Sequence, residues 1–451
     1  MCGIAGIISN QIDEQNIEQM QGMLDAQKHR GPDSQDYHQL SDQVIFGHNR
    51  LSIIDLSESA NQPFFSSDKR FCIVFNGEIY NYLELKEELS PSYEFRTEAD
   101  TEVLLAAYMH WGIQSLDRMV GMFAFAIYDR YTQEIFMARD RFGVKPCYYT
   151  HTSEGQLIFA SEIKSLHAAG IPRVRNEVMW SNYLVKGVYQ YENQTFWKDI
   201  FQLEAGHFIK FKVGTIQGLP KQTRWYDFVG NVKAILSDLK ISGRSEEAHL
   251  THYKSLVKNS IALRFRSDVP VGFNLSGGLD SSFLLSLVDE LKPDSAIEGF
   301  TFYCDDDRYD ELPWVEGLME EKKKPLSKVL LRVEDVRELS ESVMCFQDEP
   351  YGGVPTLAYS QVFERARSKG TIVLLDGQGM DEVWAGYDYY HNESDYVVQG
   401  VKNSPLNPAV LTDHFISMAS DIEYPCPFED ELLNKQYRDL FYTKIPRALR
   451  F

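Results

Sequence analysis

Apolar and polar positions follow one pattern in the first half of the chain, and this pattern predicts many short strands. The clearest apolar or alternating runs lie at 4–8, 71–75, 122–128 and 134–138. The last two of these flank a polar turn, which is typical of a hairpin. Helical spacing of apolar residues occurs at 17–27 and in a stretch that starts near Asp100. Residues 1–212 are therefore expected to form one strand-rich domain with two helices.

A second pattern begins after residue 245, where short apolar runs alternate with longer stretches of helical spacing. The predicted strands cover 269–275, 299–303, 329–333 and 371–375, and the predicted helices cover 246–264, 311–322, 335–346 and 356–369. Because strands alternate with helices in doubly wound parallel sheets, we expect residues 246–451 to form an α/β domain. Residues 213–245 lack clear periodicity and carry Gly, Pro, Lys and Ser, which favours a linker and surface ribbon.

The composition narrows the class of protein. Of the 451 residues, 43% are hydrophobic and 25% are charged, an ordinary globular balance, but the formal net charge is -21. Such a surface repels nucleic acid and anionic membranes. The six cysteines include no Cys-x-x-Cys pair, and no apolar stretch approaches the ~20 residues of a membrane span. We expect a cytoplasmic protein with small-molecule substrates and no nucleic-acid or membrane partner; a homodimer is one open arrangement.

The first residues carry the strongest chemical signal. Met1 is expected to be removed because residue 2 is small, which leaves Cys2 with both a thiol and a free α-amine. An α-amine has a pKa of roughly 7.7–8.0 in small peptides, so it can act as a base for the thiol, as in N-terminal nucleophile enzymes. Residues 4–8 would hold this terminus as a buried strand. The alternative is a cysteine placed there by chance on a frayed terminus.

Several polar residues stand at predicted strand ends or at a helix start in this half. The planar guanidinium of Arg50 could hold a carboxylate, and Asn76 with the N–H of Gly77 could donate to an oxyanion. Glu78 and Asp100 could hold an ammonium. Each also has an ordinary interpretation, since Asn-Gly is the commonest hairpin-turn dipeptide, an Asp at a helix start is often an N-cap, and an Arg is often in a surface ion pair.

Taken together, residues 1–212 resemble the glutaminase domain of class II glutamine amidotransferases. The matching stretches are 1–4, 30–33, 50–53, 75–81, 100–102 and 138–146. The resemblance implies that Cys2 attacks the side-chain amide of glutamine and that Asn76 and Gly77 form the oxyanion hole. It also implies a glutamine-binding set of Arg50, Leu51, Ile53, Asn76, Glu78 and Asp100. The implied fold is α+β, a four-layer α-β-β-α sandwich of the N-terminal nucleophile type.

In the second half, the predicted strand 269–275 leads into a glycine-rich turn, Ser276-Gly277-Gly278-Leu279-Asp280-Ser281-Ser282, and then a helix. Backbone N–H groups and the helix dipole make such a turn an anion site. The turn lacks Gly-Lys-Ser/Thr, so it is not a Walker A loop. Hydroxyls of Ser276, Ser281 and Ser282 could donate to phosphate, and Asp280 could hold Mg²⁺. An ordinary βα turn that needs glycine is the alternative.

Two acidic segments, 348–350 and 376–382, follow predicted strands or helices of the same sheet. Carboxylates that face a phosphate loop make sense with a bridging metal, although an N-cap pair is an alternative for Asp381 and Glu382. This half resembles the synthetase domain of glutamine-hydrolysing asparagine synthetases, an ATP pyrophosphatase fold. The resemblance implies Mg²⁺ at Asp280 and Asp381. It places ATP on Leu275, Ser276, Gly277, Gly278, Asp280, Ser281, Phe302, Asp376 and Gly377.

Two departures from that family bear on function. Gln378 stands where the family usually has Glu, at the end of the site that would hold the acyl acceptor. The chain also stops at Phe451, where the family continues into helices that carry cations for pyrophosphate. The synthetase half is therefore expected to be incomplete, with glutamine hydrolysis intact and little or no amide product.

The favoured hypothesis is a glutamine-dependent, asparagine synthetase-like amidotransferase. Cys2 would release ammonia from glutamine, ATP would activate aspartate as an acyl-adenylate, and ammonia would form asparagine with loss of AMP and pyrophosphate. Two alternatives stay open at this point. One is amidation of a different carboxylate, such as a sugar acid or a peptide, and the other is a truncated glutaminase or regulatory protein without synthetase activity.

Overall fold

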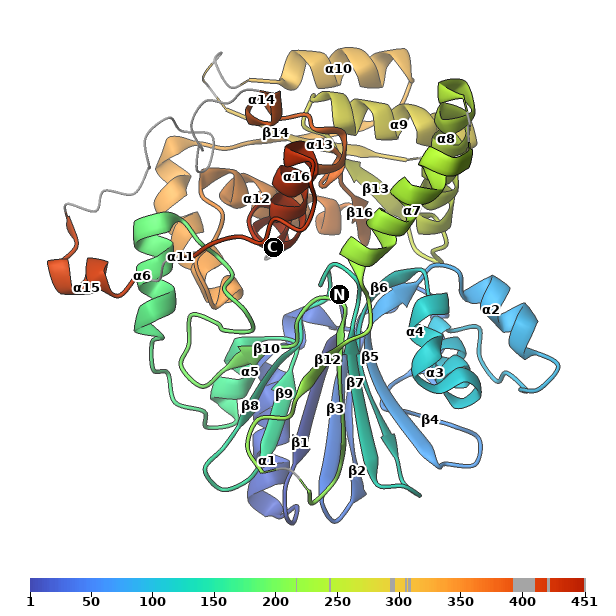
Figure 1. Cartoon of the computed structure of the whole chain (residues 1–451), viewed down its shortest axis with the longest axis vertical. Coiled ribbons are helices and arrows are strands. Elements are labelled where there is room, and N and C mark those ends of the chain that lie inside the picture. Colours follow the sequence, from blue (N-terminus) through green and yellow to red (C-terminus); the bar gives the residue numbers. More distant parts are fainter. Residues whose placement is uncertain are drawn as a thin grey trace. The chain divides into compact units, whose positions relative to one another are not determined.

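The computed structural model describes residues 1–215, 217–242, 245–292, 297–304, 306, 310–391, 410–419 and 422–449. The chain divides into two compact units (Figure 1). Unit 1 contains Met1–Phe228 and Val397–Glu423, and unit 2 contains Val229–Tyr396 and Tyr424–Phe451. Each unit is described by itself below.

Unit 1 contains two antiparallel sheets of six strands each. The first sheet has the order β10-β8-β9-β1-β3-β2 and consists of β1 (Gly3–Ile8), β2 (Ser34–Ser41), β3 (Val44–Arg50), β8 (Tyr148–His151), β9 (Leu157–Ala160) and β10 (Phe201–Gln202). The second has the order β12-β11-β7-β6-β5-β4 and consists of β4 (Phe64–Phe65), β5 (Phe71–Ile79), β6 (Gly121–Asp129), β7 (Glu134–Arg139), β11 (His207–Lys212) and β12 (Gln222–Arg224).

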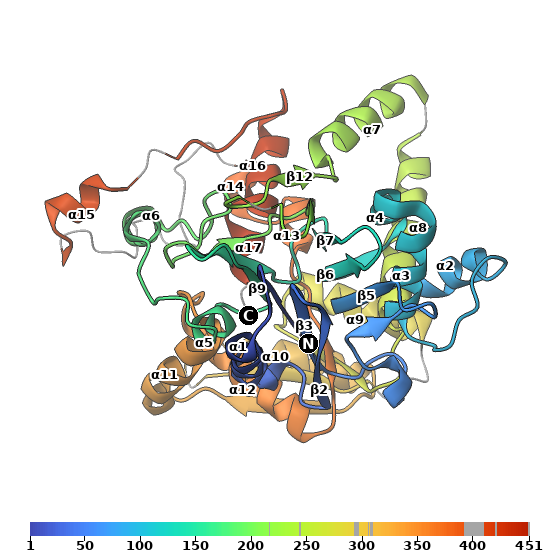
Figure 2. The same ribbon diagram turned by 90° about the horizontal axis from the view of Figure 1, so that it is seen from below.

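The two sheets pack face to face, and helices cover their outer faces (Figures 1 and 2). One core cluster joins apolar residues of both sheets, including Phe46 and Val74. The first sheet packs outward on α1 (Glu14–Ala26) and α5 (Ile163–Ala168). The second packs outward on α2 (Tyr82–Leu89), α3 (Asp100–Trp111) and α4 (Ser115–Arg118). The predicted α-β-β-α sandwich is confirmed. Helices α6 (Glu177–Lys186) and α15 (Asp413–Ser417) complete the α-helices described for this unit, and the 3-10 turn Lys28–Arg30 follows α1.

Unit 2 is built on a four-stranded parallel sheet with the order β15-β14-β13-β16. Its strands are β13 (Val271–Asn274), β14 (Gly299–Tyr303), β15 (Leu326–Leu330) and β16 (Val373–Leu375). Its helices are α7 (Phe228–Ser242), α8 (Glu246–Arg264), α9 (Leu279–Leu291), α10 (Leu312–Glu321), α11 (Val336–Gln347), α12 (Val354–Ser368), α13 (Met380–Trp384), α14 (Asp388–His391), α16 (Glu431–Phe441) and α17 (Lys444–Ala448).

Helices cover both faces of this sheet. One cluster packs Phe273 and Leu275 against α8, α9 and α10, and a second packs Phe300 against Val362 and Ala366 of α12. The strands of a parallel sheet covered on both faces are short apolar runs in the sequence. The sequence pattern could therefore predict these strands. The predicted doubly wound α/β arrangement is confirmed.

Two local expectations are corrected by the structure. Residues 213–245, predicted as linker and ribbon, contain the edge strand β12 and the helix α7. Strand β12 has three residues, too few for alternation to show, and Gly230 and Ser237 obscure the helical spacing of α7. The strand predicted at 329–333 lies at Leu326–Leu330, because parallel pairing with β14 starts at Gly299 and Leu326. Among the described residues, no helix is long and apolar enough to cross a membrane.

Candidate active site

Four of the residues predicted to act on glutamine, Cys2, Arg50, Asn76 and Glu78, lie on the inner faces of the two sheets of unit 1. Side chains alternate between the faces of a strand. The even-numbered residues of three strands fill the inner core, namely Ile4 and Ile8 of β1, Val44 and Phe46 of β3, and Cys72 and Val74 of β5. The same alternation directs Cys2, Arg50, Asn76 and Glu78 to this layer. Because Gly3 pairs with Asn49, the start of β1 and the end of β3 lie at the same end of the sandwich.

Cys2 precedes β1 and contacts the segment that follows β3. The N–H of Leu51 lies 3.5 Å from Cys2 Sγ, and the Sγ lies 3.6 Å from the Leu51 carbonyl oxygen. On its other side, Arg30 Nε donates to the Cys2 carbonyl oxygen at 2.8 Å. Burial raises the pKa of the Cys2 thiol, whereas the N-terminal amine, the Leu51 N–H and Lys145 act to lower it. The cysteine is therefore held rigidly, and the frayed-terminus alternative is wrong.

Arg50 is buried at the end of β3, with 5% of its surface exposed, so it is not in a surface ion pair. Its Nη1 donates to the Ser57 carbonyl oxygen and to Asn61 Oδ1, both at 2.7 Å, and its Nη2 donates to the Asp55 carbonyl oxygen. Its Nε makes no hydrogen bond within the described residues. The guanidinium thus organises the segment 51–61, which also contains the half-buried Leu51 and Ile53.

Asn76 and Gly77 lie inside β5 and pair with Ala124 and Phe123 of β6, so the hairpin-turn alternative is wrong. Asn76 is 1% exposed, and neither its Oδ1 nor its Nδ2 has a hydrogen-bond partner within the described residues. Buried amides are nearly always paired, so this one is an orphan that a ligand could satisfy. A Cβ on Gly77 would lie 2.2 Å from the Met122 carbonyl oxygen, which restricts the position to glycine.

The backbone of β5 fixes the direction of the Gly77 N–H. The Phe75 N–H donates to Gln62 Oε1 at 2.6 Å, and the Ile79 N–H donates to Asp100 Oδ2 at 2.9 Å. Both groups therefore point away from β6. Because such groups alternate between the two edges of a strand, the Gly77 N–H points to the same edge.

Glu78 and Asp100 are both buried near this edge, with 7% and 6% of their surfaces exposed. Asp100 is the first residue of α3, whose N-cap residue is Ala99, so the N-cap alternative is wrong. Burial raises the pKa of Asp100 to about 7, against the lowering effect of the Ile79 N–H, and the negative charge of Glu78 raises it further. Two carboxylates that repel each other in a dry site are suited to share an ammonium group.

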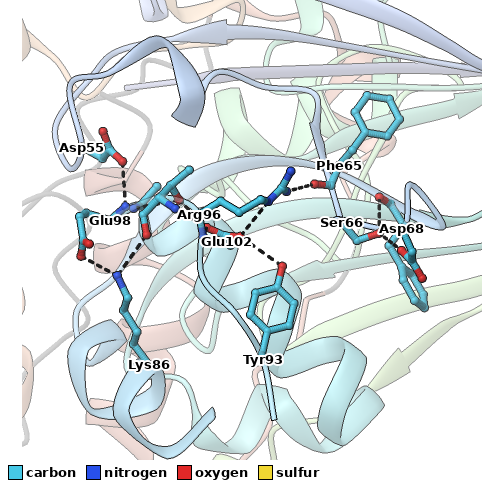
Figure 3. Close-up of polar contacts among 12 residues, drawn as sticks. Asp55, Phe65, Ser66, Asp68, Lys86, Tyr93, Arg96, Glu98 and Glu102 are labelled. Atoms are coloured by element: carbon cyan, nitrogen blue, oxygen red, sulfur yellow. Dashed lines mark hydrogen bonds and ion pairs between the residues drawn. The ribbon is translucent and has the colours of Figure 1, made fainter. Parts of the chain in front are cut away.

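A polar network fixes the loop in front of Asp100 and connects it to the segment after Arg50 (Figure 3). The fully buried Glu102 carboxylate accepts hydrogen bonds from the backbone N–H groups of Arg96 and Thr97, at 3.0 and 2.7 Å, and from Tyr93. Asp55 Oδ2 accepts from the Glu98 N–H at 2.8 Å. The loop before α3 and the segment held by Arg50 are thus positioned by one set of hydrogen bonds.

The structure also adds residues to the site for which the sequence suggested no role. Arg30 Nη1 donates to Glu162 at 3.0 Å, and Glu162 also contacts His29 and Lys164. Burial acts to raise the pKa of Glu162, but the hydrogen bond from His29 and the charges of Arg30 and Lys164 lower it to about 2. Arg30 lies in a stretch that matches the family, which is a usable signal, whereas nothing in the sequence distinguishes Glu162.

Two buried polar side chains hold β5 at the level of Asn76. His48 Nε2 lies 3.0 Å from the Phe75 carbonyl oxygen, and Gln62 Nε2 donates to the same oxygen at 3.3 Å. Burial lowers the pKa of His48 to about 3, so its ring is neutral. Both residues position the strand that carries Asn76, and neither would be found from the sequence without knowing that β3 faces β5.

In unit 2, the predicted ATP loop connects β13 to α9. Gly277 has a φ of +75° and a Cβ there would lie 3.0 Å from Glu311 Cβ, so the turn needs glycine. Ser276 Oγ and Ser281 Oγ lie 3.3 Å apart, and Ser282 Oγ donates to the Gly278 carbonyl oxygen at 2.8 Å. These hydroxyls stabilise the loop itself. Leu275 is buried beneath it.

The loop after β16 meets this turn, because β13 and β16 are neighbours in the sheet. A Cβ built on Gly377 would lie 3.3 Å from both Asp280 Cβ and the Ser281 nitrogen. Asn274 Nδ2 donates to Asp376 Oδ2 at 2.9 Å. The predicted ATP residues of the two loops are therefore brought together at the carboxyl ends of the strands, where doubly wound sheets bind ligands.

Asp280 and Asp381 also come together. The pKa of Asp280 is raised by burial and then by the negative charge of Asp381, whereas the backbone N–H of Asp381 acts to lower it. Helix α13 has Gly379 as its N-cap residue, so the N-cap alternative for Asp381 and Glu382 is wrong. No group of three or more potential metal ligands occurs in the part of the chain that the structure describes. A pair of carboxylates suffices for Mg²⁺ when substrate phosphates complete its shell.

The remaining residues predicted for unit 2 are less closely associated with the β13–α9 turn and the loop after β16. The Phe302 ring packs edge-on against Tyr359 of α12, with 5.5 Å between ring centroids. Gln378 is exposed in the loop after β16. In the segment 348–350, Asp348 is the C-cap of α11 and Glu349 is buried.

The fold and these two candidate sites are those expected of an amidotransferase in which an N-terminal sandwich of the glutamine amidotransferase type precedes a doubly wound α/β unit. Comparison with known families agrees in both halves. Residues 1–226 match the family described as the glutamine amidotransferase domain, and residues 252–436 match the family described as asparagine synthase. The chain belongs to the glutamine-hydrolysing asparagine synthetase family.

The curated relatives extend along nearly the whole chain. It is 33% identical to the glutamine-hydrolysing asparagine synthetase 1 of Bacillus subtilis strain 168 over 450 residues, which cover 96% of this chain and 67% of that protein. It is 32% identical to asparagine synthetase 2 of the same strain, covering 86% of this chain and 52% of that protein. Among solved structures, the glutamine phosphoribosylpyrophosphate amidotransferase of Bacillus subtilis matches with a TM-score of 0.36 at 17% identity, covering 72% of this chain and 65% of that one.

Proposed function

We propose that this chain is a glutamine-dependent asparagine synthetase, in which unit 1 releases ammonia from glutamine and unit 2 uses ATP to activate aspartate. The observation that carries the glutaminase half is the buried amide of Asn76, which has no hydrogen-bond partner among the residues that the structure describes and lies on the same inner layer as Cys2. The family membership supports asparagine as the product. Gln378, which is exposed in the loop after β16, would orient the carboxylate of the acceptor through its side-chain amide.

The glutaminase step is assigned to groups of unit 1. With Met1 removed, the α-amine of Cys2 accepts the thiol proton, and the thiolate sulfur attacks the side-chain carbonyl carbon of glutamine. The carbonyl oxygen becomes negative, and Asn76 Nδ2 and the Gly77 N–H donate hydrogen bonds to it. Ammonia leaves with the proton returned by the amine, and water then hydrolyses the thioester to glutamate.

Binding of the glutamine backbone groups is assigned to the charged residues around this point. Glu78 and Asp100 would hold the α-ammonium, which relieves the repulsion that raises the Asp100 pKa. Arg50 would hold the α-carboxylate through its unused Nε, or by exchanging a carbonyl of the segment 51–61. Leu51 and Ile53 would line the site from that segment.

The synthetase step is assigned to the two loops of unit 2. ATP would lie on the β13–α9 turn and the loop after β16, with Phe302 beside it, and Asp280 and Asp381 would hold Mg²⁺. Their mutual repulsion supports a bound cation. The metal would neutralise charge on the phosphates, and the turn would orient them at the start of α9.

The test measures three products on the same sample of the full chain with glutamine, ATP, Mg²⁺ and aspartate. Wild type is expected to release glutamate, and asparagine with pyrophosphate in equal amounts shows the synthetase half at work. Cys2→Ala is expected to lose glutamate release while ammonia-dependent synthesis survives. Glutamate release that persists in Cys2→Ala contradicts the assignment of the nucleophile, and an amide other than asparagine formed from a different carboxylate contradicts the assignment of the acceptor.

A further inference from the structure

Lys145 is a buried cation that the proposed mechanism does not use. It is 6% exposed, in the turn that follows β7. Its ammonium makes no hydrogen bond and no ion pair with any residue that the structure describes, although lysine is almost never buried without a partner. Burial lowers its pKa accordingly. Because an unpaired buried charge is costly, its presence calls for an explanation other than stability.

The backbone on both sides of Lys145 is fixed. The buried Asp140 carboxylate accepts hydrogen bonds from the N–H groups of Phe142, Val144 and Lys145, at 3.1, 2.9 and 3.0 Å. Arg139 Nε donates to the Lys145 carbonyl oxygen at 2.7 Å. Several buried hydrogen bonds therefore fix the backbone position of this one residue.

The same turn is attached to the strand that faces the predicted oxyanion hole. Asp140 Oδ2 also accepts from the Phe123 N–H at 3.1 Å, and Phe123 is the partner of Gly77 across β5 and β6. The groups that act on the Lys145 charge are Glu78, Arg30, Asp140 and Cys2, in that order. Of these, Asp140 already accepts backbone hydrogen bonds, and Glu78, Arg30 and Cys2 belong to the candidate glutaminase site, so the Lys145 charge acts on groups of that site.

We propose that Lys145 is a positioning residue of the glutaminase reaction, and that its buried ammonium acts through charge to ease ionisation of the Cys2 thiol and to keep the α-amine of the processed N-terminus free to accept the thiol proton. This inference rests on the proposed role of Cys2. A nearby positive charge favours a thiolate and disfavours an ammonium. Both effects prepare the nucleophile and its base for reaction at neutral pH.

Lys145 is one of several charged groups around Cys2. The others are the α-amine of Met1, Arg30 from the turn after α1, Arg50 at the end of β3, Glu78 on β5 and Asp100 at the start of α3. Glu78 and Asp100 are negative and oppose ionisation of the thiol. Arg30 and Arg50 are committed to other acceptors, at Glu162, the Cys2 carbonyl and the segment 51–61. Lys145 is therefore a cation near Cys2 that has no hydrogen-bond or ion-pair partner in the part of the chain that the structure describes.

The test uses the full-length processed chain and three lysine variants. Lys145→Met removes the charge and keeps the length, Lys145→Arg keeps the charge, and Lys198→Met is a control at an exposed lysine of the same unit. The rate of Cys2 alkylation by iodoacetamide, without glutamine, is measured from pH 5 to pH 10, with Cys2→Ala to define the background. The thermal midpoint of each variant, and its kcat and KM for glutamate release from glutamine, are measured alongside.

The rate of Cys2 alkylation should increase with pH as the thiol ionises. In Lys145→Met, this rising limb of the pH–rate curve should lie about one pH unit higher than in wild type, which is at the lower end of the effect of a neighbouring charge. Lys145→Arg and Lys198→Met should follow wild type, and Lys145→Met should be no less heat-stable than wild type because it loses an unpaired buried charge. An unchanged limb in a folded Lys145→Met overturns the proposal, as does a change in KM for glutamine alone, which would mean that Lys145 only holds Glu78.

If Lys145→Met does not fold, Lys145→Gln is measured in its place, and the same two outcomes decide. Failure of this inference is distinguishable from failure of the proposed function. Glutaminase activity retained in Cys2→Ala contradicts the function itself. An inactive Cys2→Ala combined with an unshifted limb in Lys145→Met contradicts only the role of Lys145.

Discussion

Asp100→Asn gives the sharpest test of the glutamine site, because it removes a charge while an oxygen remains to accept the Ile79 N–H. The pKa of Asp100 is raised from 3.8 to about 7. A folded pKa above the unfolded one means that the ionised carboxylate destabilises the fold, and the cost appears as pH rises from about 4 through 7. The shift of about 3 units corresponds to about 4 kcal/mol at pH 8. The variant should be more stable than wild type by up to that amount.

The same charge should be required for glutamine binding, so the two effects have opposite signs. Losing one partner of a buried ion pair costs ~3 kcal/mol, or about a hundredfold in KM. In wild type, KM should also rise about tenfold from pH 8 to pH 6, as Asp100 takes up a proton near pH 7. In Asp100→Asn that dependence should disappear.

The assay pairs initial rates of glutamate release, over a range of glutamine concentrations at pH 6 and pH 8, with urea midpoints at pH 5 and pH 8. The stability difference between variant and wild type should be less than half as large at pH 5, since Asp100 of the folded wild type is then protonated and the fold no longer buries its charge. A variant that is no more stable than wild type at pH 8, or whose KM still varies with pH as in wild type, would refute the reasoning.

Three further outcomes are expected. Asn76→Ala should lower kcat for glutamate release by about a hundredfold with little change in KM, because its amide acts on the oxyanion; steady-state kinetics with an unchanged kcat would remove Asn76 from the hole. Arg50→Ala should chiefly raise KM, and a kcat loss at constant KM would place Arg50 in the chemical step. Asp381→Asn should weaken Mg²⁺-dependent ATP binding by calorimetry, whereas Asp388→Asn on α14 should not; equal affinity in both variants argues against a metal at Asp381.

Much of the fold could be predicted because its elements follow local rules. Helix α8 covers Glu246–Arg264 and strand β14 covers Gly299–Tyr303, both at their predicted bounds. The misplaced strand β15 shows where local rules stop. The residues after Val329 are more apolar than Ser327 and Lys328, but pairing with β14 selects Leu326 as the start. Tertiary pairing there overrides the apolar count.

The candidate site was predictable to the extent that it lies on strands. Cys2, Asn76 and Glu78 have even numbers, as do the core residues of β1 and β5, so their side chains lie on the same face of each strand as the core. Two sheets that face each other must therefore bring them to one layer. The sequence cannot show which residues hold them there. Arg30 and Glu162 are 132 positions apart, and their contact depends on the return of the chain through β9.

Lys145 is a second residue whose role the sequence alone could not show. Its place in a motif is visible in the sequence, but its significance comes from burial without a partner, which only three-dimensional structure reveals. A lysine of a glycine-containing turn would ordinarily be taken as exposed. The pairing of Asp140 with four backbone N–H groups shows instead that the turn is closed around its carboxylate.

The charged residues around Cys2 are held in an arrangement that glutamine itself would complete. Glu78 and Asp100 repel each other, and Lys145 has no direct partner among the described residues, so the fold buries these negative and positive charges at a cost in free energy. The sandwich core beneath them supplies the stability that permits this. A zwitterionic amino acid carries an ammonium for the two carboxylates and a carboxylate for Arg50, so if it binds as proposed it would lower the electrostatic cost of the site. The same arrangement discriminates against ligands that carry only one of these charges, since they would leave one buried group unpaired.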